Sequence, residues 1–242
     1  MPIKVCHMTS AHSRRDIRIY HKQCRSLLKA GYLVHMVVAD GEGDDNVDEI
    51  IIHDVGRPQN RFERFLVSTF RILRCAFGVR AKVYHFHDPD LFFAGMILTI
   101  FGRKVIYDIH EDYPKDVYSK RWVPKYLKPP ISILFEIINW ISARCFAALV
   151  IAWPKIMRGF MKQKVIQVGN YPVLSDFTQL VPYASRSNNL VMVGGISVNR
   201  SAREIAEACH KIEGCKEFKL IIAGKIDRKD FEQEFLDLIE GC

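Results

Sequence analysis

The chain has 242 residues, 49% of them hydrophobic and 26% charged, and its 35 basic and 27 acidic side chains give a formal net charge of +8. Ordinary hydrophobic content with only 14 glycines and 10 prolines excludes a disordered, collagen-like or low-complexity chain. The sequence holds no run of about 18 uncharged apolar residues, so it predicts no membrane-spanning helix.

Short apolar runs alternate with helical patterns from the first residues onward. Strands are predicted at 3–8, 32–39, 49–55, 83–87, 104–109, 147–152 and 164–168. Helices are predicted at 17–30, 62–77, 91–101 and 131–146, with a short helix before the last strand and a Gly- and Asp-rich loop at 40–48. This alternation predicts an α/β fold with a doubly wound parallel sheet, in which ligands lie at the carboxyl ends of the strands.

A polar, proline-containing segment then interrupts the pattern. We interpret residues 171–188 as a linker that follows a first domain at 1–170. A second β-α-β-α unit occupies 189–242, with strands at 190–193 and 218–223 and helices at 200–212 and 228–239. Because two strands make a poor sheet, we expect this unit to be only the first part of a domain.

Polar residues follow three of the predicted strands. The loop at 9–16 leads into a helix N-terminus, which suits an anion, although an ordinary capped loop explains it equally well. It has no glycine, so it is neither a dinucleotide-binding loop nor a P-loop. The segments at 85–90 and 108–112 add a dense group of histidines and carboxylates. Strand alternation places His85 and His87 on one face of their strand.

Two chemistries fit these clusters. One is metal-assisted hydrolysis with a ligand set of His85, His87, Asp88, Asp108 and His110. The other is group transfer, in which histidines and carboxylates orient hydroxyl groups and stabilise developing charge. In a purely structural interpretation, Asp88 and Asp90 cap the next helix and His85 is a core histidine. The seven cysteines form no C-x-x-C pair, so we expect free thiols in a reducing compartment and no metal or redox role for them.

An ordered set of motifs distinguishes between these chemistries. The motifs are DIRI (16–19), HFHDPDLF (85–92), YDIHEDYP (107–114), VGNYP (168–172), MVGGISVNR (192–200) and LIIAGKID (220–227). In this order they resemble the retaining glycosyltransferases of family 4, which have the GT-B fold of two Rossmann-like domains. The match is to bacterial members that build O-antigen, capsule or exopolysaccharide.

The resemblance implies roles for individual residues. His110, Glu111 and Asp88 would be the catalytic group beside the donor sugar. The acceptor side would be formed by His12, Arg14, Asp16, Arg18 and Asp90. The nucleotide diphosphate would be bound by Gly194, Gly195, Arg200 and Lys225. The resemblance implies no metal and no cofactor apart from the nucleotide-sugar substrate.

The sequence also departs from the family pattern. Two glutamates eight positions apart, which hold the donor in the family, have no counterpart after Gly224. We therefore expect a truncated C-terminal domain and an incomplete donor site, which puts the activity of the 242-residue chain in question. An alternative is a non-catalytic, membrane-associated subunit whose second domain is completed by another chain.

The basic excess lies in the first 173 residues, which favours an anionic partner. Cations and aromatic residues alternate in the two stretches 57–82 and 115–128. Such a stretch either lies on an anionic membrane or packs its aromatic stripe into the core. Nucleic acid is disfavoured because no binding motif is present. With the resemblance, we expect a cytoplasmic protein at the inner face of the plasma membrane that acts on a lipid-linked glycan.

Overall fold

The computed structural model describes residues 2–120, 122–156, 164–174, 181–187, 189–211, 219–226 and 229–240, without the side chains at 199, 229 and 230. The chain divides into two compact units, Met1–Leu174 and Ser175–Cys242, and each is described by itself. No helix in these described ranges is long and apolar enough to cross a membrane. Arg121 and most of the short helix expected between residues 152 and 164 lie outside the described residues.

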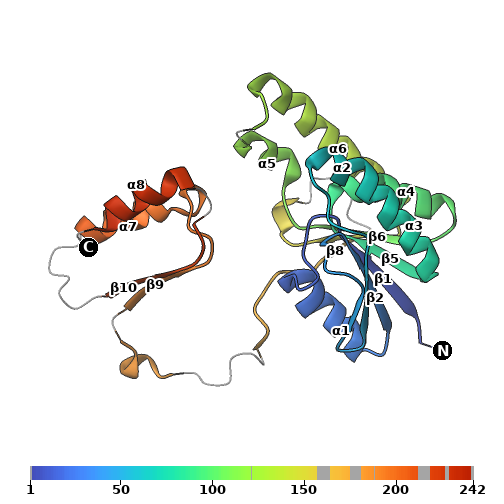
Figure 1. Ribbon diagram of the computed structural model, residues 1–242, viewed down its shortest axis with the longest axis horizontal. Helices are drawn as coiled ribbons and strands as arrows, with labels where there is room; N and C mark the ends of the chain where they lie inside the picture. Colours follow the sequence, from blue (N-terminus) through green and yellow to red (C-terminus); the bar gives the residue numbers. More distant parts are fainter. Residues whose placement is uncertain are drawn as a thin grey trace. The chain divides into compact units, whose positions relative to one another are not determined.

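The first unit is built on one eight-stranded sheet (Figure 1). Its strands are β1 (Lys4–Met8), β2 (Leu33–Val38), β3 (Asp45–Val47), β4 (Ile50–Asp54), β5 (Val83–Phe86), β6 (Lys104–Ile109), β7 (Ala148–Ile151) and β8 (Val165–Gln167). Their order is β3-β4-β2-β1-β5-β6-β7-β8, and every pair is parallel except β3 with β4. The predicted doubly wound parallel sheet is confirmed.

Helices cover both faces of this sheet (Figure 1). The helices of the unit are η1 (Ile17–Cys24), α1 (Arg25–Lys29), α2 (Arg61–Glu63), η2 (Arg64–Ser68), α3 (Thr69–Val79), η3 (Pro89–Leu91), α4 (Phe92–Ile100), α5 (Tyr113–Ser119), η4 (Lys125–Leu127), α6 (Lys128–Cys145) and η5 (Pro154–Ile156). The larger core cluster joins α3 and α4 to one face, and a smaller cluster packs η1 against the other. Both η1 and η2 are π-helical, so two of the predicted α-helices contain wider turns.

Besides the short helices η4 and η7, the sequence analysis missed β3 and α5. The segment at 40–48, expected to be a loop, contains β3, which pairs antiparallel to β4 at the sheet edge. Polar residues in a three-residue edge strand give no hydrophobic alternation to detect. The second basic stretch begins inside α5, whose proline in the first turn is compatible with a helix start.

The second unit contains a two-stranded parallel sheet and two longer helices. Its elements are η7 (Tyr183–Ser185), β9 (Asn189–Val193), η8 (Val198–Arg200), α7 (Ala202–Lys211), β10 (Lys219–Ala223) and α8 (Lys229–Ile239). Phe231 and Phe235 of α8 pack with Ala202 and Ala206 of α7 to form its small core. The ends expected for its helices and second strand at Ile212, Phe218 and Arg228 lie outside the described residues.

Close packing around Gly95 in α4 leads to a test of the core. A Cβ at Gly95 would lie 2.7 Å from Phe86 Cε1 and 3.1 Å from Phe146 Cζ. We therefore expect Gly95→Ala to lower the free energy of unfolding by about 1–3 kcal/mol, as overpacking does. Urea titration followed by circular dichroism measures this change.

Gly78 in α3 is the matched control, because a Cβ there would meet nothing within 4 Å. Gly78→Ala should stabilise the protein by about 0.5–1 kcal/mol, the usual gain in helix propensity. A stabilising effect of both substitutions would contradict the packing described for α4.

Candidate functional site

Three polar loops meet at the carboxyl edge of the first unit's sheet. They follow β1, β5 and β6, which are neighbours in the sheet, and they begin at Thr9, His87 and His110. Side chains of the three loops contact one another there. This edge is where the sequence predicted that ligands would bind.

Asp88 ties the first loop to the second. Its Oδ2 accepts a hydrogen bond from the Thr9 hydroxyl at 2.6 Å and from the backbone N–H groups of Ser10 and Ala11 at 2.7 and 3.3 Å. Its side chain makes no capping hydrogen bond to η3, so the expected capping role is wrong for Asp88. The buried carboxylate instead fixes the loop after β1. That loop donates the hydrogen bonds that a buried carboxylate needs.

His12 lies between two carboxylates. Its Nδ1 is 3.3 Å from Asp16 Oδ2, and its Nε2 is 3.4 Å from Asp88 Oδ1. The hydrogen bond with Asp16 raises the pKa of His12, although partial burial opposes this. Burial alone would raise the pKa of Asp16, but contacts from His12 and from the N–H groups of Ile19 and Arg18 lower it to about 2. The arrangement therefore favours a charged imidazolium at position 12.

His110 contacts His12, but its pKa is shifted in the opposite direction. The two ring centroids are 5.2 Å apart in an edge-to-face arrangement. Burial lowers the pKa of His110; Asp108 opposes the shift and His12 adds to it. The buried Nδ1 of His110 has no hydrogen-bond partner among the described residues. A neutral imidazole with a free nitrogen thus lies beside a charged one.

The two remaining predicted acids, Asp90 and Glu111, follow β5 and β6. Asp90 is buried, accepts a hydrogen bond from the Ser10 hydroxyl at 2.7 Å and lies 3.1 Å from Arg64 Nε. Burial raises the pKa of Asp90, and the charge of Asp88 raises it further. Glu111 is exposed, and its hydrogen bond with Asp116 adds to burial in raising the pKa of Asp116.

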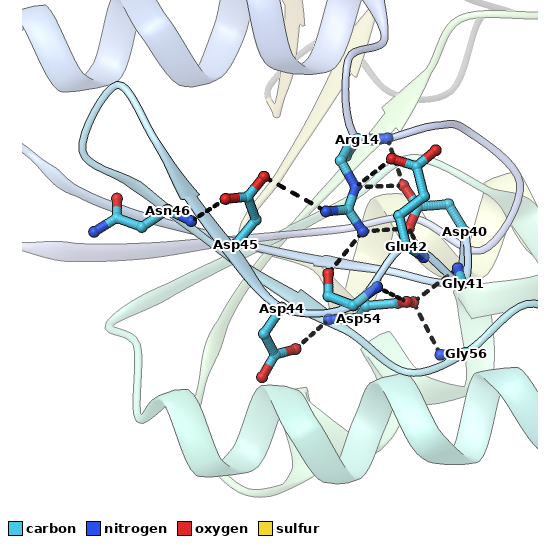
Figure 2. A network of polar contacts seen from close by, with 10 residues as sticks. Arg14, Asp40, Gly41, Glu42, Asp44, Asp45, Asn46, Asp54 and Gly56 are labelled. Atoms are coloured by element: carbon cyan, nitrogen blue, oxygen red, sulfur yellow. Dashed lines mark hydrogen bonds and ion pairs between the residues drawn. The ribbon is translucent and has the colours of Figure 1, made fainter.

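Arg14 belongs to a different network (Figure 2). Its Nε and Nη2 bond both oxygens of Asp40 at 2.9 and 2.7 Å, and Nη2 also bonds the Gly43 carbonyl at 2.8 Å. Glu42 and Asp45 lie 3.3 and 3.7 Å from the same guanidinium. Arg14 is buried and holds the loop between β2 and β3, and it makes none of these contacts to the histidine pair.

Arg18 forms a buried ion pair with Asp108. Its Nε and Nη2 bond the two oxygens of Asp108 at 2.9 and 2.8 Å, and Nη1 bonds the Val168 carbonyl at 2.9 Å. Gln23 donates a third hydrogen bond to Asp108 at 2.7 Å. Burial opposes ionisation, but His87 and Arg18 hold the pKa of Asp108 well below its usual range. Arg18 therefore joins η1 to β6 and to the chain after β8.

The residues of the metal-hydrolase alternative do not form one site. In the described part of the chain, the ligand group that could share one ion is His7, His85 and His87, without a carboxylate. Asp88 is bonded to the first loop and Asp108 to Arg18. A hydrolase with mixed histidine and carboxylate ligands is therefore not favoured.

In the second unit, the predicted residues lie on the two turns that follow β9 and β10, except Arg200, which ends η8. Gly194 has φ +122°, and its N–H bonds the Ala223 carbonyl at 2.9 Å. A Cβ at Gly224 would lie 1.7 Å from the Gly194 carbonyl oxygen, so both positions require glycine. Arg200 Nη1 is 2.9 Å from where a Gly194 Cβ would stand, and Lys225 follows Gly224 directly. Gly195 completes the turn after β9.

Several residues of these sites were missed. Thr9, Ser10 and Gln23 donate hydrogen bonds to carboxylates that lie more than seventy positions away in the chain. Strand register alone brings them together, and one sequence does not contain that information. Gly224 carried a detectable signal, because it follows a strand as Gly194 does.

Comparison with known proteins gives a family and a fold. The sequence matches the model of Glycosyltransferase Family 4 over residues 18–163. No curated protein matches it. A solved sucrose-phosphate synthase from Thermosynechococcus elongatus superposes with a TM-score of 0.64 at 13% identity, over 99% of this chain and 68% of that chain.

Two further structures share the fold. The catalytic domain of starch synthase IV from Arabidopsis thaliana, bound to ADP and acarbose, has a TM-score of 0.62 at 10% identity, over 98% of this chain and 71% of its own. Anabaena HepE, in complex with UDP and glucose, has a TM-score of 0.57 at 11% identity, over 98% of this chain and 66% of its own. The predicted GT-B-like fold is confirmed.

The Arg18–Asp108 ion pair leads to a stability prediction. Asp108→Asn removes the charge that compensates a buried guanidinium, so we expect the free energy of unfolding to fall by about 3–5 kcal/mol. Urea titration measures the loss. As a control, Lys115→Gln removes the exposed Lys115–Asp112 pair and should change stability by less than about 1 kcal/mol. Equal effects of the two substitutions would rule out a special role for the buried pair.

Proposed function

The chain belongs to glycosyltransferase family 4, and we propose that it transfers a sugar from a nucleotide-diphosphate sugar to a lipid-linked glycan in bacterial surface polysaccharide synthesis. The transfer is of a hexosyl group, with retention of configuration. O-antigen and capsule are the classes of product. The acceptor lies at the inner face of the plasma membrane, and neither a metal nor a cofactor takes part in the transfer.

One observation carries the proposal: a neutral histidine, His110, lies beside a charged one, His12, at the ligand-binding edge of the sheet. The His110 side chain is only half-buried, and an imidazole nitrogen can hydrogen-bond a sugar hydroxyl. The fixed charges of Asp16, His12 and Asp88 can orient groups without rearrangement during the reaction. In retaining transfer the leaving phosphate assists the acceptor, so the protein's contribution is position and charge.

The second unit supports a diphosphate donor. Glycine at 194 and 224 lets the two turns pack closely against each other, at the carboxyl ends of parallel strands, where ligands bind in such sheets. Lys225 follows Gly224, and the guanidinium of Arg200, at the end of η8, lies beside Gly194, so both supply positive charge next to these turns. Glycine turns with adjacent cations suit a phosphorylated ligand.

The first unit also exposes an aromatic, basic surface. Phe62, Phe65 and Phe70 of the first basic stretch are exposed, with Phe62 at 73% and Phe70 at 64%, whereas Leu73 packs into the core. Part of this stretch is therefore exposed, as membrane binding requires, and part of it packs into the core. The Arg61 guanidinium stacks on Trp122 at 4.0 Å and so joins the two basic stretches. Aromatic rings among cations suit an anionic lipid surface.

A transfer assay tests the main proposal. Nucleotide release is measured with a panel of UDP- and GDP-sugars and a bacterial lipid extract. We expect His110→Ala to lower turnover by about 100-fold or more, as loss of one oriented polar group does, without changing UDP or GDP affinity. Arg200→Met should weaken nucleotide binding by about 10- to 100-fold in calorimetry, because it removes a charged hydrogen-bond donor.

Arg203 is the control for the donor site, because it lies on α7 and pairs with Glu234 of α8. Arg203→Met should leave nucleotide affinity unchanged. Absence of nucleotide binding by the unsubstituted chain, or equal losses in the two variants, would overturn the donor assignment. Addition of EDTA should change neither binding nor turnover.

Vesicle sedimentation tests the membrane surface. We expect binding to phosphatidylglycerol-containing vesicles that weakens with salt, and Phe62→Ser should reduce it by about 10-fold through lost apolar burial. Ile100 at the end of α4 is exposed to a similar extent, at 77%. It leads into the start of β6, at the edge of the sheet opposite to the carboxyl edge. Ile100→Ser should therefore leave vesicle binding unchanged, and a loss as large as that of Phe62→Ser would refute the assigned surface.

A further inference from the structure

Three histidines form a buried cluster on one face of the first sheet. His7 of β1 is paired in register with His85 of β5, and His87 follows β5 directly. Their ring centroids are 4.7 Å apart for His7–His85 and His85–His87, and 5.3 Å apart for His7–His87. His7 and His87 have no exposed surface, and His85 retains 7%. The proposed transfer reaction uses none of the three.

The cluster has more nitrogen atoms than hydrogen-bond partners. His7 Nδ1 lies 3.0 Å from His87 Nε2, and one proton between them satisfies both. His85 Nε2 is buried and has no hydrogen-bond partner in the described residues. Native interiors rarely leave a buried polar atom unpaired, so this nitrogen calls for a ligand.

The three side chains are of a type that coordinates transition metals. Neutral imidazoles keep a lone pair for coordination, and imidazole suits zinc, copper and nickel.

A supporting carboxylate is also in place. Asp108 Oδ2 lies 3.3 Å from His87 Nδ1, and Arg18 and Gln23 fix that carboxylate. Metal-binding histidines commonly direct their second nitrogen to such a carboxylate, which orients the ring. This leaves His87 Nε2 to face His7.

We propose that His7, His85 and His87 bind one divalent transition-metal ion, for which zinc is the best candidate. Ligand atoms of the three side chains lie within 4.8 Å of one another. The ion takes the place of the proton between His7 Nδ1 and His87 Nε2, whose 3.0 Å separation is close to the ~3.3 Å between tetrahedral zinc ligands. The site is structural, since His12 and His110 form the separate group at the edge. It goes beyond the proposed transfer function and does not depend on it.

Metal loading of the full chain tests the inference. The purified protein is treated with EDTA, desalted, incubated with Zn²⁺ and desalted again, and its zinc content is measured by mass spectrometry. We expect about one equivalent per chain, and a higher unfolding temperature for the loaded protein than for the EDTA-treated protein. Co²⁺ should give a visible absorption band whose intensity saturates at one equivalent.

His35 provides a matched control. It forms a similar pair with His53, at 3.0 Å, but among the described residues no third histidine joins them. His35→Gln should retain the full equivalent of zinc, whereas His85→Gln should lose at least 90% of it. A zinc content below about 0.1 equivalent in the unsubstituted chain overturns the proposal. Zinc binding by His85→Gln equal to that of the unsubstituted chain overturns it as well. If His85→Gln does not fold, the cobalt titration of the unsubstituted chain decides by itself.

Discussion

The buried ion pair between Arg18 and Asp108 is the constraint on which the carboxyl edge depends. An ionised pair without exposure to water is stable only when nearly every donor and acceptor is satisfied, and here Gln23 and the Val168 carbonyl complete the set. The first helix, the sixth strand and the chain after the eighth strand are thereby fixed to one another. The loop that carries His110 begins one residue after that strand ends, so its position follows from the same contact.

Carboxylates at this edge have divided roles. Asp88 and Asp108 satisfy backbone and side-chain donors, whereas Glu111 is exposed. Residue type alone therefore does not separate acids that maintain the fold from acids that can contact a ligand. Burial and the number of donors do separate them, and both depend on contacts between distant parts of the chain. The same reasoning divides the basic residues, since Arg14 and Arg18 are paired internally while Arg200 is exposed at the end of η8.

Much of the fold could be predicted from the sequence because local signals and the overall sheet agree. Apolar strands such as Lys104–Ile109 and capped helices such as the one after Asp16 have clear local sequence signals. The polar strand β3 and the helix α5, which begins with a proline, have no such signal and were missed. For the site, the motifs predicted which loops matter but not the pairing inside them: the ring of His7 contacts that of His85 only because β1 and β5 are adjacent and in register.

The π-helical winding of η1 has a further consequence for how this chain can vary. Arg18 and Gln23 are five positions apart, and both donate to Asp108. In an α-helix, residues five apart point about 140° away from each other, so they could not share one carboxylate. In a π-helix the hydrogen bonds join residues five apart, which places these side chains one above the other. The length of Ile17–Cys24 is therefore fixed by a polar contact and not by helix propensity. The chain should tolerate substitutions in this segment more readily than the insertion or deletion of one residue.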